Sequence, residues 1–454
     1  METLRTSSYL IPVKLESEPG KYMLIHGYTG AIDIVTESLL KKIQAAASGV
    51  DLPEDTLQAL IKRGYITTRS QEEEYAYVAR MATALHRKGK ILATTFTWVV
   101  TYNCNFRCPY CFENRTSKDG INSIVFTKEE VDCVYDAIDK IQPHSKLRSS
   151  TMTLYGGEPL LSENKEIVSY IVSEGRKRGF KFCAITNGYD LDSFLDLLSP
   201  ESIYKLQITI DGPKDTHNQR RIHYKHHDTF DRIVHNIELA LKHDVKVAVR
   251  MNVDGNNISK FVELKQYFQS IGFHSYSNFS MYSAVLRDYD AISLQEHKQL
   301  DFISANSYIK QHQQQNTIDS CYDYGLSKFL LKAMLGKRSI LFRSAFCLAQ
   351  VGGYVFAPHG KIYPCWEVIG KDRFCIGTYS KLELSWNTEV LEEWRGVDIT
   401  KRKQCSQCCY ALLCGGGCPA RFLEGKNTHC HFFKKMFNHS TNQAYVRFRD
   451  SFNN

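Results

Sequence analysis

Three cysteines stand close together about a quarter of the way along the chain. Cys104, Cys108 and Cys111 follow the apolar run TFTWVV in the stretch CNFRCPYC, with the spacing C-x3-C-x2-C. Thiolates are soft ligands that suit zinc or iron–sulfur clusters. Three thiolates can hold three corners of a [4Fe–4S] cube and leave one iron open for a small molecule, as a catalytic metal site does. The alternative is a zinc knuckle, which would need a fourth ligand; the nearest further cysteine is Cys133, inside an expected helix.

A second group of cysteines crowds the C-terminal part of the chain. Its pattern runs Cys347-x12-Gly360-x4-Cys365, then Cys405-x2-Cys408-x5-Cys414-x3-Cys418, and ends with Cys430. C-x2-C pairs can also bind zinc, so the spacing alone does not distinguish a zinc site from an iron–sulfur cluster. The chain has 15 cysteines, none of them before Cys104, and this clustering points to metal or redox chemistry rather than to disulfides.

Length and composition limit the class of protein. The 454 residues are 43% hydrophobic and 23% charged, which predicts a globular chain of two or three domains. No 18-residue apolar run and no apolar N-terminal signal segment occur, so we expect a cytoplasmic protein without a membrane span. The net charge of +8 is spread along the chain, which suits an acidic peptide partner and makes nucleic acid an unlikely one.

Strand and helix patterns alternate through the middle of the chain. Apolar runs predict strands over residues 95–102, 150–157, 180–188, 204–212 and 245–253. Helical spacing predicts helices over 127–141, 164–179 and 230–243, the first with a capping box from Thr127 to Glu130. This alternation predicts an α/β fold with a parallel sheet, either a barrel or an open sheet. Ligands bind at the carboxyl ends of such strands, which is where Cys104 and the stretches GGEP, TNG and DGP fall.

The first 92 residues contain no cysteine, and we expect them to form a separate module. Two short strands are expected around a glycine turn in 21–35, and a helix capped by Thr36 over 36–49. A second helix that runs into a strand is expected over 52–69, and a further helix over 75–89. Small strands with short helices predict a winged-helix-like module. The alternative is a plain extension packed on the main domain.

The cysteine loop and the strand-end motifs together resemble the radical SAM superfamily. The resemblance implies a partial (β/α)6 TIM-like barrel over residues 93–310, with a [4Fe–4S] cluster on Cys104, Cys108 and Cys111 that cleaves S-adenosyl-L-methionine (SAM) to a radical. It also implies a set of SAM contacts: Tyr110, Gly156, Gly157, Glu158, Asn187, Thr209 and Arg221. A glutamate suits the methionyl ammonium, and glycines let a backbone approach closely.

The C-terminal cysteine pattern resembles the SPASM domain, here residues 311–454. The resemblance implies two auxiliary [4Fe–4S] clusters, and therefore three clusters in all. The outer one would be held by Cys405, Cys408, Cys414 and Cys430, and the inner one by Cys347, Cys365 and Cys418. The inner set lacks a fourth thiol, so either Cys375 or Cys409 completes it or one iron is open to a substrate thiolate. The other cysteines, Cys133, Cys183 and Cys321, are expected to be core thiols.

These resemblances lead to one preferred hypothesis and two alternatives. The preferred one is a maturase that forms a crosslink, preferably a cysteine thioether, in a ribosomally made precursor peptide. The N-terminal module, similar to PqqD-like domains, would bind the leader by strand addition, and a flavodoxin or ferredoxin would supply electrons. The alternatives are an anaerobic sulfatase-maturating enzyme and a non-enzymatic iron–sulfur or zinc scaffold. Asp211 and Glu367 are candidates for a general base.

Overall fold

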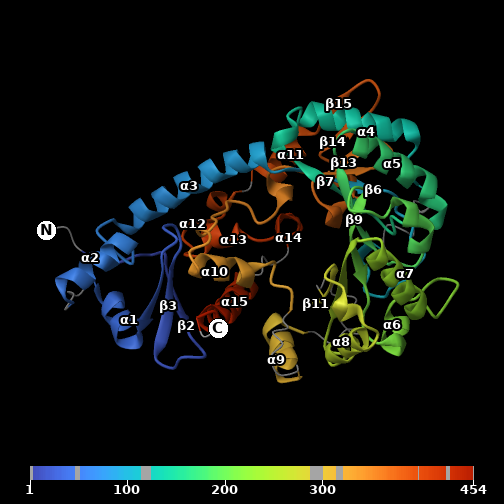
Figure 1. The fold of residues 1–454 in the computed structure, drawn as a ribbon. Coiled ribbons are helices and arrows are strands. Elements are labelled where there is room, and N and C mark those ends of the chain that lie inside the picture. Colours follow the sequence, from blue (N-terminus) through green and yellow to red (C-terminus); the bar gives the residue numbers. More distant parts are fainter. Residues whose placement is uncertain are drawn as a thin grey trace. The chain divides into compact units, whose positions relative to one another are not determined.

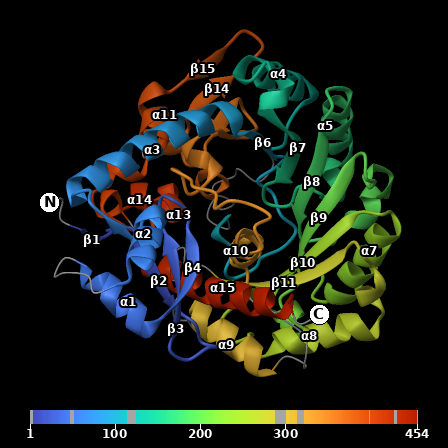
Figure 2. The same ribbon diagram turned by 60° about the vertical axis from the view of Figure 1, so that its left-hand side comes forward.

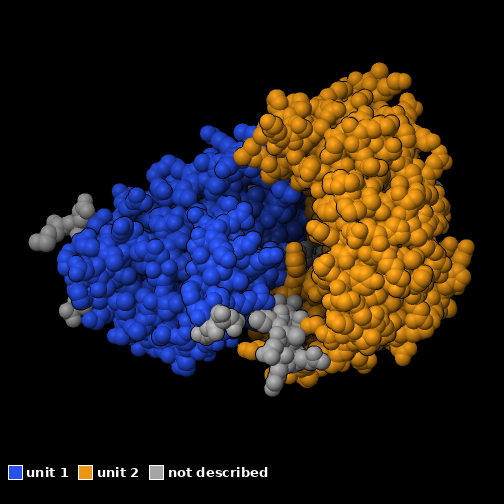
Figure 3. Space-filling view, viewed as in Figure 1, with its two compact units in different colours: residues 1–91, 323–351, 393–454 blue, residues 92–322, 352–392 orange. Residues whose placement is uncertain are grey.

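The computed structural model describes residues 4–46, 52–113, 124–286, 300–312, 321–396, 398–425 and 430–452. The expected end of the first helix, near Gly49, lies outside these ranges. The chain forms two compact units (Figure 3). Unit 1 contains residues 1–91, 323–351 and 393–454, and unit 2 contains residues 92–322 and 352–392. These units cut across the three-part division into 1–92, 93–310 and 311–454, which stays a prediction.

Unit 2 is built on a parallel sheet that confirms the predicted α/β fold. Six strands that follow one another in the chain also lie side by side, in the order β11-β10-β9-β8-β7-β6, and every adjacent pair is parallel. They are β6 (Thr94–Val99), β7 (Arg148–Tyr155), β8 (Lys181–Thr186), β9 (Ile203–Thr209), β10 (Lys246–Val253) and β11 (Phe279–Val285). The first five were predicted from their apolar runs, because parallel strands covered on both faces are apolar throughout.

Helices lie along the outside of this sheet (Figures 1 and 2). They are α4 (Lys128–Ile141), α5 (Lys165–Lys177), α6 (Lys214–Arg220), α7 (Phe230–Lys242), α8 (Lys260–Ser270) and α9 (Phe302–His312). The predicted capping box is confirmed, since Thr127 accepts from the Glu130 amide and the Glu130 carboxylate accepts from the Thr127 amide. Between β8 and β9 the connection is a 3-10 segment, Leu191–Leu197, instead of an α-helix.

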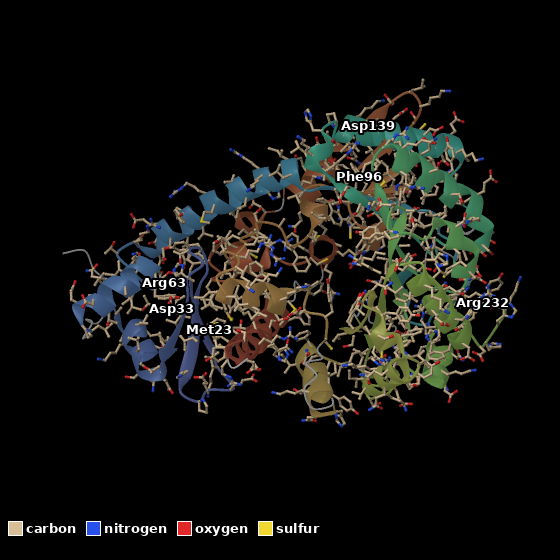
Figure 4. The ribbon with its side chains drawn as sticks, in the orientation of Figure 1. Met23, Asp33, Arg63, Phe96, Asp139 and Arg232 are labelled. Atoms are coloured by element: carbon tan, nitrogen blue, oxygen red, sulfur yellow. The ribbon has the colours of Figure 1, made fainter. Side chains whose placement is uncertain are left out.

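A late segment of the chain extends the same sheet beyond β6. Strand β12 (Gly353–Ala357) pairs in parallel with β6, and Phe96, labelled in Figure 4, stacks on Tyr354 at 6.0 Å. Three antiparallel strands follow: β13 (Lys361–Tyr363), β14 (Gly377–Tyr379) and β15 (Leu384–Trp386). Helix α11 (Thr388–Arg395) then leads from unit 2 into unit 1.

Unit 1 begins with a small antiparallel sheet and three helices. Strands β2 (Leu10–Lys14), β3 (Lys21–His26) and β4 (Ile32–Thr36) form a three-stranded sheet, and β1 (Arg5–Thr6) pairs with β5 (Ile66–Thr67). The helices are α1 (Glu37–Gln44), α2 (Glu54–Arg63) and α3 (Gln71–Leu92), and the Thr36 cap of α1 is confirmed by its bond from the Leu39 amide. The assignment of this part as a winged-helix-like module stays a prediction.

The N-terminal module shares a core with the cysteine-rich segment of unit 1. Tyr9, Tyr28 and Val78 pack in one buried cluster with Cys405 and Leu412. The remaining helices of this unit are α10 (Leu326–Met334), α12 (Lys403–Ser406), α13 (Ala411–Cys414), α14 (Pro419–Leu423) and α15 (Cys430–Asp450). In the described part of the chain, no helix combines the length and apolarity needed to cross a membrane.

A buried histidine makes unit 1 sensitive to acid. His26 is 0% exposed, its Nε2 lies 3.0 Å from Ser7 Oγ, and its Nδ1 accepts from the Thr29 amide. Burial lowers the pKa of His26 from 6.5 to about 4, although nearby Glu74 acts in the opposite direction. Between these two pH values the unfolded chain binds a proton that the folded chain does not, so stability falls as the pH drops through that window, by about 3 kcal/mol.

We therefore expect the free energy of unfolding, measured with urea at pH 7 and at pH 4.5, to decrease with acid more in the wild type than in His26→Gln. Glutamine can keep both polar contacts but binds no proton. An identical decrease in both proteins would contradict this assignment.

Candidate active site

A cavity of about 230 Å³ opens at the carboxyl ends of the parallel strands of unit 2. Residues from six successive strand ends or the loops after them line it, as the sequence predicted for the ligand-binding edge of such a sheet. Its lining includes every SAM-contact candidate and all three cysteines of the first cluster, namely Cys104, Cys108, Tyr110, Cys111, Gly156, Gly157, Glu158, Asn187, Thr209 and Arg221.

The three clustered thiols fit a metal cluster better than free cysteines. Burial, and then the charge of Glu158, raises the pKa of Cys104 well above its usual range, and burial raises that of Cys111 to about 12. Cys108 also raises the pKa of both Cys104 and Cys111, because thiolates repel one another. Iron would supply the positive charge that buried thiolates otherwise lack. The donor set therefore fits a [4Fe–4S] cluster.

The three thiols do not form a site for a single metal ion. Among the residues that the structure describes, no three His, Cys, Asp or Glu side chains are placed to share a single metal ion. A [4Fe–4S] cube binds each thiolate at a different iron, so its ligands stand farther apart than those of one ion.

The two glycines after β7 let two loops come together. Gly156 has φ +132°, and a Cβ there would collide with the Thr101 carbonyl oxygen. A Cβ at Gly157 would lie 2.6 Å from the Tyr102 carbonyl oxygen and closer still to that of Asn103. The backbone of GGEP thus packs directly on the start of the cysteine loop, and Gly157 N and Glu158 N donate to Thr101 O and Asn103 O at 3.0 and 2.8 Å.

Glu158 joins the ends of β7 and β8. It is 2% exposed, and its carboxylate accepts from the Leu160 amide at 2.9 Å, from Thr186 Oγ1 at 2.6 Å and from the Asn187 amide at 2.6 Å. Burial raises the pKa of Glu158 to about 7, although these three hydrogen bonds act in the opposite direction. The carboxylate lines the cavity while it fixes Asn187, whose side chain in turn donates to Asn105 at 2.7 Å.

A polar network holds Tyr110 and Arg221 at the cavity wall. The Tyr110 hydroxyl donates to Asp211, accepts from Arg221 Nη1 at 3.1 Å, and lies 3.4 Å from Asn252 Nδ2. Asp211 is 0% exposed, and its second oxygen accepts from the Asn252 amide at 3.0 Å. These bonds occupy the Asp211 carboxylate, so it positions Tyr110. Arg221 Nε is buried without a hydrogen-bond partner in the described structure, and the side chain lines the cavity, which suits an anionic group of a ligand.

Glu113, Tyr155 and Trp366 are among the cavity residues that the sequence did not predict. Burial raises the pKa of Glu113 to about 8, although a hydrogen bond with Tyr155 acts in the opposite direction. Tyr155 stacks on Trp366 with ring centroids 5.3 Å apart, and both line the cavity. The available signals were Glu113 two residues after Cys111 and Trp366 directly after Cys365. The other base candidate, Glu367, follows Trp366, and its amide donates to Cys365 Sγ at 3.5 Å.

The predicted outer cluster lies within unit 1, and its four cysteines are electrostatic neighbours. Burial, and then the charges of Cys405, Cys408 and Cys430, raise the pKa of Cys414 to about 12. The Arg402 guanidinium lies among them, where it donates to the Gly416 carbonyl oxygen and lies 3.9 Å from the centre of the Phe422 ring. Four thiols that act on one another electrostatically form a donor set that fits an iron–sulfur cluster.

The predicted inner set is distributed over both units. Cys347 and Cys418 belong to unit 1, whereas Cys365 and Cys375 belong to unit 2, so this set stays a prediction. The Cys375 thiol donates to the Gly377 carbonyl oxygen at 3.2 Å. The Cys409 thiol hydrogen-bonds to Cys408, and this bond lowers the pKa of Cys408 to about 6. Of the expected core thiols, Cys133 and Cys321 are buried and Cys183 is half-buried.

Comparisons with known proteins agree with this geometry. Residues 98–268 match the radical SAM superfamily. The chain is 23% identical over 368 residues to the cysteine-type anaerobic sulfatase-maturating enzyme of Clostridium perfringens, covering 74% of this chain and 93% of that protein. The structure of native anSMEcpe with bound AdoMet and Cp18Cys peptide has a similar fold, with a TM-score of 0.58 and 18% identity over 79% of this chain and 99% of that one. SuiB of Streptococcus suis bound to its precursor peptide SuiA covers 93% of this chain and 97% of its own, with a TM-score of 0.50 and 14% identity.

Proposed function

We propose that this radical SAM enzyme matures a ribosomally made precursor peptide by forming a crosslink, preferably a cysteine thioether. The enzyme class rests on the match of residues 98–268 to the radical SAM superfamily. The observation that carries this proposal is the open edge of the N-terminal sheet, which offers a place for a leader peptide. The similarity to SuiB, a protein solved with its precursor peptide, extends over 93% of this chain and supports it.

The proposed cofactor ligands belong to three sets of thiols. Cys104, Cys108 and Cys111 would hold the cluster that binds SAM, and Cys405, Cys408, Cys414 and Cys430 would hold an auxiliary cluster. Cys347, Cys365 and Cys418 would hold a third. When bound, SAM and its cluster supply the one-electron chemistry that removes a hydrogen atom from the substrate.

The chain's own residues would orient the reactants. Arg221, fixed by Tyr110, would face the methionyl carboxylate, and Glu158 would face the ammonium while it keeps the Asn187 turn in place. Thioether formation removes two hydrogen atoms from the peptide. One would leave with the adenosyl group. The other would leave as a proton, released to solvent, and an electron, for which an auxiliary cluster would be the acceptor.

The free edge of β4 is suited to strand addition. Hydrogen bonds from the His26 amide to Ala31 O and from the Glu37 amide to Gly20 O set the phase of the β3–β4 ladder. Along an antiparallel strand, every second residue forms backbone hydrogen bonds with the neighbouring strand, and the residues between point their amide and carbonyl groups away from it. Ile34 is one of the residues between, so its amide and carbonyl point away from β3, to the open side of β4. The Ile34 side chain is 41% exposed. Neighbouring Arg63, labelled in Figure 4, donates to Ile32 O at 2.8 Å and pairs with Asp33 at 2.5 Å, which holds β4 in place.

We expect Ile34→Pro to weaken leader binding at least about tenfold without unfolding unit 1. Proline removes the outward N–H that an added strand would use, and it is tolerated on an edge strand at such a position. The measurement is the Kd of a fluorescent precursor peptide, with the melting temperature followed in parallel. Ile34→Val is the matched control, because it keeps the N–H and the β-branched shape. Unchanged binding by the proline variant would contradict leader recognition at this edge.

The second candidate function is formylglycine formation on a sulfatase. It is favoured by the similarity to the Clostridium perfringens enzyme, which spans 93% of that protein. Mass spectrometry of the reacted peptide separates the two functions, since a crosslink loses two hydrogen atoms and keeps sulfur, whereas formylglycine made from cysteine loses the sulfur. An aldehyde product would replace the crosslinking proposal with this one.

A further inference from the structure

A second cavity of unit 2, of about 510 Å³, lies beside the cysteine loop. It is lined by the first residues of that loop and by the loops after β7, β8 and α6, together with Arg232 of α7, which is labelled in Figure 4. Cys104 belongs to the lining of this cavity and also to that of the SAM cavity. The cysteine loop is therefore the wall between the two cavities, and we call the second one the outer pocket.

The wall of the outer pocket is tied to the cysteine loop by backbone hydrogen bonds. The Arg107 amide donates to Ile222 O at 2.7 Å, and the Tyr224 amide donates to Asn105 O at 3.0 Å. His223 fills the space behind them, with its ring 4.5 Å from that of Tyr189 and 5.7 Å from that of Phe106. The segment around Tyr224 is thus held in a fixed position against the loop that carries Cys104.

The rim of the outer pocket is cationic and aromatic. Tyr224 is 54% exposed and lies between two cations, with Lys225 Nζ 5.1 Å and the Arg107 guanidinium carbon 5.7 Å from its ring centre. Among the described residues neither cation has a carboxylate partner. The two carboxylates of the pocket have other partners: Glu163 accepts from Asn103 at 3.0 Å, and Asp190 accepts from the Ser162 amide and pairs with Arg232.

We propose that the outer pocket is the docking site of an acidic one-electron carrier protein, of the flavodoxin or ferredoxin type, which reduces the cluster held by Cys104. The proposal rests on the radical SAM domain. That chemistry needs one electron from outside, and the carrier loses it as the cluster gains it. In the described part of the chain, neither of the two cations near the exposed Tyr224 has a carboxylate partner. Arg107 is held in place by hydrogen bonds from its Nη1 to the carbonyl oxygens of Cys104 and Phe106 at 2.5 and 2.8 Å. Such a rim suits a brief contact with an acidic surface, because aromatic residues and arginine anchor interfaces while opposite charges speed the encounter. Redox encounters of this kind use small contact areas.

The test uses the reconstituted full-length enzyme and measures how fast a reduced flavodoxin reduces its cluster in a stopped-flow instrument. Lys225→Glu and Tyr224→Ala should each slow this reaction about tenfold, and the rate should fall with added salt less steeply in Lys225→Glu than in the wild type. Reduction by dithionite should be unchanged in both variants, because a small reductant needs no docking surface.

Lys128→Glu is the control for reversing a lysine charge on unit 2 outside the outer pocket, although Lys128, unlike Lys225 in the described structure, pairs with Glu166 at 2.5 Å. Lys128 is also an exposed lysine over a tyrosine of unit 2, with Nζ 5.7 Å from the Tyr170 ring, and it does not line the outer pocket. The cluster of the Lys128→Glu variant should be reduced at the wild-type rate. Wild-type rates in Lys225→Glu and Tyr224→Ala, or an equal loss of rate with dithionite, would overturn the proposal. SAM cleavage and peptide product are assayed with dithionite, so a failure of the proposed function is seen separately.

Discussion

Replacing Cys104, Cys108 and Cys111 together by alanine is expected to remove about four iron atoms per chain and to abolish SAM cleavage. The three thiols line one cavity, and burial disfavours the free thiolate at each of them, so a bound metal cluster would stabilise the charged form. Iron and sulfide analysis gives the stoichiometry, and electron paramagnetic resonance of the reduced protein shows whether SAM still perturbs a cluster.

Cys183→Ala provides the matched control for this measurement. Cys183 is a half-buried thiol of β8 that lies 3.3 Å from Thr153 Oγ1, and its loss should leave the iron content unchanged. In a separate variant, only Cys405, Cys408, Cys414 and Cys430 are replaced. This variant should bind about four irons fewer than the wild type and keep the SAM-sensitive signal. If the first variant retained its full iron content, the assignment of the cysteine loop would be wrong.

The parts of the fold predicted from the sequence are those fixed by local pattern. Strands β6 to β10 are buried apolar runs, and the Thr36 cap and the Thr127 box are set by neighbouring residues. Strand β11 was missed, because FSMYSAV places serines among its apolar residues and leaves much of the strand half-buried. The pairing of β12 with β6 was also missed, since it joins segments about 250 residues apart and leaves no local signal.

In the candidate site, too, some features could be predicted from the sequence and others could not. The spacing and order of the motifs predicted which residues line the cavity, because the carboxyl ends of parallel strands meet at one edge. The partners of those residues could not be predicted, since they come from different strands. Tyr110 meets Asp211 and Arg221 more than a hundred residues away, and Glu158 meets Thr186 on the next strand. Asp211, expected as a possible base, is held by these partners in a positioning role.

The role of Gly157 leads to the last prediction, that Gly157→Ala costs several kcal/mol and prevents assembly of the SAM cluster. From the sequence, this glycine was expected to let the backbone approach the ligand. In the structure it lets the GGEP turn approach the cysteine loop, where an added Cβ would meet the carbonyl oxygens of Tyr102 and Asn103. Backbone atoms cannot rotate away as a side chain can, so the two loops must separate, and overpacking that displaces backbone costs more than a poor side-chain contact.

Gly179→Ala separates this steric effect from backbone strain. Gly179 has φ +80° and no atom within 4 Å of an added Cβ, so alanine there meets only the cost of a left-handed residue, about 1 kcal/mol. The melting temperature and the iron content of both variants are compared after the same reconstitution. Gly179→Ala should melt slightly lower and bind iron normally, whereas Gly157→Ala should lose both stability and about four irons. Equal behaviour of the two variants would mean that the loops do not depend on this close contact.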